Sequence, residues 1–69
     1  MDEETKQTMR DLGYKEGGND STWYRTGSYA AVYKPDRNVT VWKARFSKDQ
    51  WETFHDPIAA AAWLNVELS

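Results

Sequence analysis

The chain of 69 residues has no cysteine, a single histidine and no hydrophobic run of the length that crosses a membrane. Without cysteine it forms no disulfide and no thiolate metal site, as is common in proteins of a reducing compartment. One histidine among scattered carboxylates matches no metal-ligand spacing, so we expect no metal and no other cofactor. A membrane helix needs about 20 apolar residues, and residues 1–4 are too acidic for a secretory signal. We therefore expect a cytoplasmic protein that does not associate with membranes.

Aromatic residues, in contrast, are plentiful: four tryptophans, four tyrosines and two phenylalanines. A chain of this length is expected to fold as one small domain over residues 1–69, with a compact core. Each ring buries about 150–250 Å², so ten rings are more than such a core holds. Some of them are therefore expected on the surface, where they suit recognition.

The net charge of −2 conceals an uneven distribution of charge along the chain. Residues 23–50 contain six basic and two acidic residues, a balance of +4. Residues 1–22 contain six acids and three bases, and residues 51–69 contain three acids and no base. The basic middle indicates where an anionic partner would bind, although six basic side chains are also typical of an ordinary solvated surface.

The pattern of polarity predicts an α+β fold. Residues 1–20 read as a short acidic helix, stopped by Gly13, and a loop. Residues 21–54 alternate with a period of two and predict a three- to four-stranded antiparallel sheet. Residues 56–68 predict a C-terminal helix that packs on one face of the sheet, with the small side chains of the alanine run (59–62) allowing a close approach. The expected strands lie in the segments 21–26, 28–34, 39–46 and 50–54.

The alternation also assigns the two faces of the sheet, because successive side chains of a strand point in opposite directions. The inward set, expected to meet the helix, is Ala30, Val32, Trp42, Ala44 and Phe46. The outward set is Tyr29, Tyr33, Lys43 and Arg45, with Arg25 or Trp23 nearby. Such an outward face is open to solvent unless the N-terminal helix covers it.

The pair His55-Asp56 has two interpretations, a catalytic dyad or the corner between a strand and a helix. No serine or cysteine in a nucleophile motif accompanies the pair, which argues against catalysis. Asp56 followed by Pro57 matches the preferred residues at a helix N-cap and first turn. We therefore expect a cap, and we expect that the protein is not an enzyme.

Three features occur together between residues 23 and 68. They are W-x-A-x-F in the strand at 39–46, Thr53-Phe54 at the end of the last strand, and alanines after a small polar cap. This combination resembles the AP2-type DNA-binding domains and the related amino-terminal arm-binding domains of tyrosine integrases. In those families a three-stranded antiparallel sheet packs on one helix and enters the DNA major groove. The resemblance implies a sheet-on-helix fold, with DNA contacts from Lys43 and Arg45.

The sequence thus favours a small interaction module, of the type that phages and mobile elements encode, which binds a protein partner through the aromatic and basic face of its sheet. The alternative is a domain that binds DNA or single-stranded nucleic acid with the same face. A homodimer formed through an open edge strand is a further alternative. The candidate binding residues are Arg25, Tyr29, Tyr33, Arg37, Lys43 and Arg45.

Overall fold

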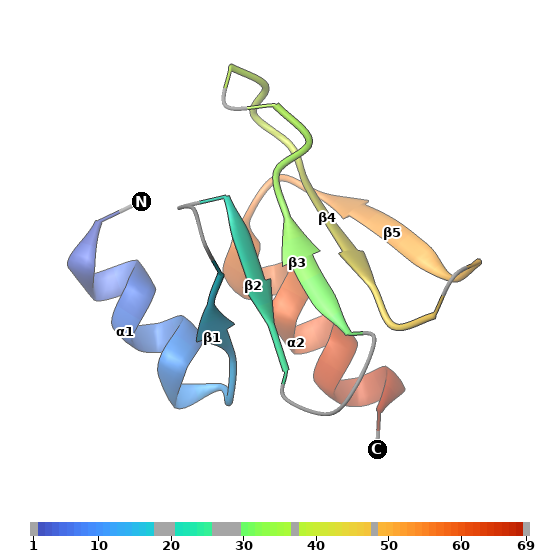
Figure 1. Ribbon diagram of the computed structural model, residues 1–69, viewed down its shortest axis with the longest axis horizontal. Helices are drawn as coiled ribbons and strands as arrows, with labels where there is room; N and C mark the ends of the chain where they lie inside the picture. Colours follow the sequence, from blue (N-terminus) through green and yellow to red (C-terminus); the bar gives the residue numbers. More distant parts are fainter. Residues whose placement is uncertain (1, 18–20, 26–29, 37, 48, 69) are drawn as a thin grey trace.

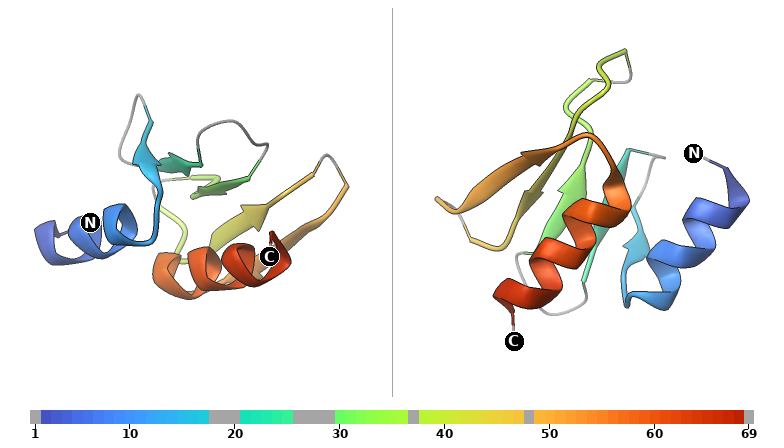
Figure 2. Two further views of the ribbon diagram at one scale, coloured as in Figure 1. Left: turned by 90° about the horizontal axis from the view of Figure 1, so that it is seen from below. Right: turned by 180° about the vertical axis from the view of Figure 1, so that it is seen from behind.

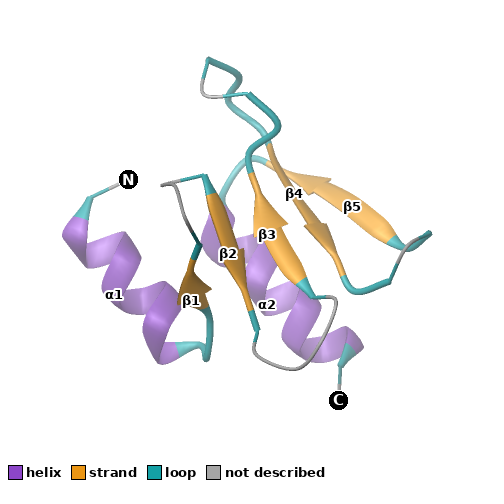
Figure 3. Ribbon diagram, viewed as in Figure 1, coloured by secondary structure: helices purple, strands orange, loops and turns teal. Residues whose placement is uncertain are grey.

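The computed structural model describes residues 2–17, 21–25, 30–36, 38–47 and 49–68. Figures 1 and 3 show two helices and one sheet, with the elements in the order α1, five strands, α2. The bounds are α1 Glu3–Asp11, β1 Lys15–Glu16, β2 Thr22–Tyr24, β3 Ala31–Tyr33, β4 Trp42–Arg45, β5 Trp51–Phe54 and α2 Pro57–Glu67.

The five strands form one antiparallel sheet in chain order, β1-β2-β3-β4-β5, so each strand pairs with its neighbours in sequence. The α+β class, the N-terminal helix and the C-terminal helix on the sheet are confirmed, and the sheet has five strands where three or four were expected. The additional strand is β1, in the segment 15–20 whose composition predicts a loop. It pairs through Lys15 with Tyr24 and through Glu16 with Trp23. Two residues are too few to show a period of two in the sequence.

Local hydrogen bonds set the ends of α1. The Asp2 side chain accepts from the backbone N–H of Thr5 at 2.8 Å, and this hydrogen bond lowers the pKa of the Asp2 carboxyl. Glu3 and Glu4 in the first turn favour the positive end of the helix dipole. Gly13 follows the helix with φ +95°, a left-handed conformation that glycine adopts without strain.

The start of α2 confirms the predicted cap. The Asp56 side chain accepts from the backbone N–H of Ile58 at 3.0 Å, and Pro57 occupies the first turn, where its missing N–H leaves no bond unmade. His55 is exposed at the corner before the helix. The pair is therefore a strand-to-helix corner.

Both helices lie on the same side of the sheet, α1 beside α2 (Figure 2). The core lies between this helical layer and the sheet. Within α2, Ala60 and Ala61 are fully buried, so the helix approaches the strands closely. The predicted inward set is confirmed, since four of its members are buried and Phe46 packs against them. The buried residues are Met9, Tyr14, Trp23, Ala30, Val32, Trp42, Ala44, Ala60, Ala61 and Leu64. Neither described helix is long and apolar enough to cross a membrane.

Candidate functional site

The outward face of the sheet is the side opposite the two helices, and the strand registers arrange its side chains in two rows. Because Trp23, Val32 and Ala44 are buried on the helical side, their neighbours in each strand point outward. The first row runs across all five strands: Lys15, Tyr24, Ala31, Arg45 and Trp51. The second row runs across the central strands and β5: Thr22, Tyr33, Lys43 and Thr53. Neighbours in a row are about 4.8 Å apart from strand to strand.

Large apolar rings are open to solvent on this face. Tyr24 is 41% exposed, and Trp51 is 50% exposed at the far end of the same row. The Lys43 ammonium lies 4.0 Å from the centroid of the Trp51 ring, a cation–π contact between adjacent strands. Ala31 lies between Tyr24 and Arg45 in the row. The face therefore combines exposed ring surfaces with positive charge.

The charge of the outward face has one sign. Its basic side chains are Lys15, Lys43 and Arg45, and no acidic residue occurs in either row. Within the strands, the acidic residues Glu16 and Glu52 belong to the opposite parity. Glu16 is held by α1, because its carboxylate lies 3.6 Å from Lys6 Nζ and 3.8 Å from Arg10 Nη2. Of the six bases in the middle segment, the fold thus places Lys43 and Arg45 on this face, where Lys15 of β1 joins them.

The structure brings together three of the predicted binding residues. Tyr33 and Lys43 are direct cross-strand partners, and Arg45 follows Lys43 on the same side of β4. Tyr29 and Arg37 lie outside the described residues.

Arg25 and Trp23 belong to the helical side of the sheet, and the expectation that one of them lies near the outward face is corrected. Trp23 is fully buried in the core. Arg25 Nη1 donates to Asn65 Oδ1 of α2 at 2.9 Å, and its guanidinium lies 6.0 Å from the centroid of the Tyr14 ring. The period of two explains the reversal, because the outward side chain in this strand is that of Tyr24.

Sequence reasoning missed Tyr24, Trp51 and Lys15 as outward residues. The signal for Trp51 was present, since an inward Phe54 at the end of the same strand places Trp51 and Thr53 outward. Tyr24 follows in the same way from an inward Trp23. Lys15 had no signal, because its direction depends on the pairing of β1 with β2.

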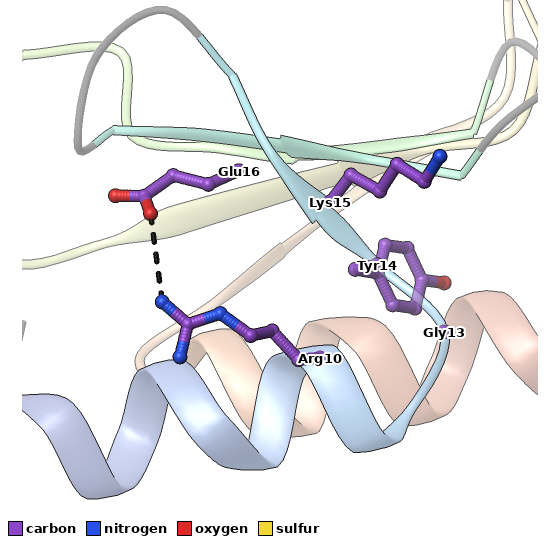
Figure 4. A pocket seen from close by; sticks show the side chains of 5 residues that line it. All are labelled: Arg10, Gly13, Tyr14, Lys15 and Glu16. Carbon is purple, nitrogen blue, oxygen red and sulfur yellow. Dashed lines mark ion pairs between the residues drawn. The ribbon is translucent and has the colours of Figure 1, made fainter.

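A second polar feature lies between α1 and β1, where an open hollow is lined by side chains of both elements (Figure 4). Arg10 and Glu16 face each other across it, and Tyr14 lies beside Gly13, away from this ion pair. Burial raises the pKa of the Tyr14 phenol, and the positive charge of Arg25 partly opposes this shift. Arg10 and Glu16 already form an ion pair with each other. The hollow is therefore explained by the contact between α1 and β1, and we do not assign it a ligand. Its lining residues are Arg10, Gly13, Tyr14, Lys15 and Glu16.

The outward face is therefore the candidate site, on the grounds of exposed rings, charge of one sign and freedom from the helical layer. Within the described residues, no group of three or more carboxylates or imidazoles gathers as a metal site. Comparison with protein-family models, with curated proteins and with solved structures finds no match for the chain.

Proposed function

We propose that this protein is a non-enzymatic interaction module, which binds a protein partner with an acidic surface through the outward face of its sheet. The single observation that carries the proposal is the acid-free face on which exposed Tyr24 and Trp51 lie beside Lys43 and Arg45. Tyrosine, tryptophan and arginine are the residues that supply most of the binding energy in protein interfaces. Most of the acidic residues of this chain lie elsewhere, so the face attracts negative charge although the net charge is −2.

The strands make this surface suitable for recognition. Side chains carried by paired strands hold their relative positions without a cost for ordering a loop, so less entropy is lost on binding. The contact between Lys43 and Trp51 limits the freedom of both side chains before a partner arrives. The rings supply apolar area, and the bases select partners with negative charge.

A photo-crosslinking experiment in cells that produce the protein tests the proposal. A benzoylphenylalanine in place of Tyr24 is expected to give covalent adducts that protease removes and nuclease does not. The matched control carries the same crosslinker at Val66, which is 72% exposed on α2 and belongs to the helical side. The double variant Lys43→Ala, Arg45→Ala is expected to abolish the Tyr24 adduct, whereas Arg10→Ala on α1 retains it. Equal adducts at both positions, or none at Tyr24, contradict the proposal.

The same face supports a second candidate function, the binding of single-stranded nucleic acid. The specific observation is the row that places Tyr24 and Trp51 on one surface with two bases and no acid, because aromatic planes stack on bases while cations hold phosphates. The resemblance to AP2-type domains implies contact with duplex DNA instead. Titration with random single-stranded and duplex oligonucleotides at two salt concentrations tests both forms. Binding that weakens steeply with salt and is lost in Lys43→Ala, Arg45→Ala supports this candidate, and no binding at low salt removes it.

A further inference from the structure

We propose that the free edge of β5 binds an extended, acidic segment of the partner protein, which joins the sheet as a sixth antiparallel or parallel strand. The inference rests on the proposed function and names the form in which the partner is recognised. Addition of a strand to an exposed sheet edge is a recurring mode of peptide recognition, in which backbone hydrogen bonds supply affinity and side chains supply specificity.

The two edges of the sheet differ in their surroundings. At one edge, β1 is only two residues long and contacts α1. At the other edge, β5 contacts β4 on one side and α2 beneath it, and no described element lies beyond it (Figures 1 and 2). The open edge of the sheet is therefore β5.

The alternation of hydrogen-bonded pairs between β4 and β5 shows which backbone groups of β5 remain free to bind an added strand. The N–H of Phe46 donates to the carbonyl of Gln50 at 3.2 Å, so these two residues form a hydrogen-bonded pair. Pairs of this kind alternate along an antiparallel ladder. Glu52 and Phe54 consequently direct their N–H and C=O groups toward β4, and Trp51 and Thr53 direct theirs toward the free edge.

The side chains of β5 leave this edge accessible. Trp51, Glu52 and Thr53 are exposed, and Phe54 is half-buried with its ring centroid 5.8 Å from that of Trp63. Natural edge strands are commonly blocked by proline, lysine or a bulge, and the four residues of β5 include neither proline nor lysine. Only Glu52 brings a charge to the edge.

Charge complementarity identifies the occupant. An added strand places alternate side chains on the outward face, next to Trp51 and within reach of Lys43, where negative charge is favoured. The other alternate side chains lie on the helical side beside Glu52 and Phe54, where the rings of Phe54 and Trp63 favour apolar groups. A second copy of β5 supplies only Trp51 and Thr53 outward and adds no negative charge, so it fits less well. A nucleic acid has no backbone N–H groups to complete the ladder.

The probe for this inference is a fluorescent octapeptide of alternating glutamate and valine, with binding followed by anisotropy. Wild-type protein is expected to bind it saturably and to bind the lysine–valine octapeptide weakly. The variant Thr53→Pro removes an edge-facing N–H without removing a hydrogen bond to β4, and proline is tolerated at such edge positions. It is expected to weaken binding about tenfold or more, since a ladder hydrogen bond is lost and the ring obstructs the added strand. Thr53→Ser retains the N–H and is the matched control.

Modified peptides test the same point without any change to the protein. An added strand donates hydrogen bonds to β5 only from alternate residues, so methylation of the amide nitrogens of either the glutamates or the valines is expected to abolish binding, and methylation of the other set to preserve it. Failure of the octapeptide to bind, equal binding of both methylated forms, or equal binding of the lysine peptide overturns the inference. A dimer in sedimentation that Thr53→Pro dissociates overturns it as well, in favour of a second copy at the edge. The Tyr24 adduct described above reports separately on the proposed function, and it survives if only the strand addition fails.

Discussion

Tyr14 joins the N-terminal segment to the last helix through polar contacts. Its hydroxyl lies 3.3 Å from Asn65 Oδ1 and 3.4 Å from the carbonyl of Ala61, and Arg25 also donates to Asn65. A buried hydroxyl needs such acceptors, because leaving it unpaired costs about 1–3 kcal/mol. A small network thus accounts for two residues, Tyr14 and Arg25, that would otherwise be candidates for a site.

The raised pKa of Tyr14 predicts a loss of stability at alkaline pH. Above the unfolded phenol pKa of about 10, the unfolded chain releases this proton while the folded protein retains it, so the free energy of unfolding falls as pH rises toward the folded pKa. The variant Tyr14→Phe is expected to be less stable by about 1 kcal/mol near neutral pH, and the difference should narrow above about pH 10. Urea unfolding at several pH values measures both. A difference that stays constant across this range contradicts the assignment.

Trp23 illustrates how burial outweighs an unsatisfied polar atom. The side chain is fully buried, and its indole N–H has no hydrogen-bond partner within the described part of the chain. Burial of a large aromatic ring of 150–250 Å², at about 25 cal/mol per Å², contributes roughly 4–6 kcal/mol. The unpaired N–H costs about 1–3 kcal/mol. The balance favours burial of this ring even with its N–H unpaired.

At the scale of elements, the start of α2 depends on Asp56 and not on His55. Asp56→Ala is expected to lower the free energy of unfolding by about 0.5–2 kcal/mol, because an amide of the first helical turn loses its acceptor. His55→Ala, one residue away and exposed, is the matched control and is expected to change stability by less than about 0.5 kcal/mol. Chemical denaturation of both variants gives the comparison. A larger effect of His55→Ala would mean that the corner is held in another way.

The alanine run of α2 has two different sides. Ala60 and Ala61 are fully buried against the sheet, and Ala59 and Ala62 are exposed. Trp63 extends past the alanines to reach Phe46 at 6.0 Å and Phe54 at 5.8 Å between ring centroids. The alanines therefore let α2 lie close to β4, and the ring of Trp63 packs against aromatic side chains toward β5.

At the scale of the whole molecule, the position of α1 decides whether a binding face exists. The helix packs against α2 and β1, on the side where the core lies, and it carries acidic residues on its exposed surface. The outward face keeps its bases free of this acidic helix. The three bases of the outward face and the acidic residues of α1 thus lie on different sides of the sheet, an asymmetry that the net charge conceals.

Met9 tests whether α1 is an integral part of the domain. Its side chain is fully buried, so Met9→Ala is expected to cost about 2–5 kcal/mol of stability. If α1 is integral, tryptophan fluorescence and far-ultraviolet circular dichroism should lose their signals at the same, lowered midpoint. Loss of helical signal with the tryptophan transition unchanged would mean that α1 docks independently of the sheet.

Some features of this protein follow from the sequence by itself. The cap at Asp56, the inward direction of Trp42 and Ala44, and the outward direction of Tyr33, Lys43 and Arg45 depend on hydrogen bonds and side-chain alternation within a few residues. Hydrogen bonding and alternation act between residues close in the chain, and the polarity of the alternating residues indicates which set faces a core. The α+β class follows from them as well, because the order of the periodic segments restricts the architecture.

Other features were decided only by the tertiary structure. The strand at Lys15–Glu16 exists because it pairs with β2, and the hydrogen bond from Arg25 to Asn65 joins residues forty positions apart in the chain. The side on which α1 packs and the free edge of β5 are likewise properties of contacts between distant segments. These contacts stabilise the protein only once the distant segments are folded together, so no local sequence pattern predicts them. The candidate site combines both sources: local alternation supplies its side chains, and the fold leaves its face and edge open.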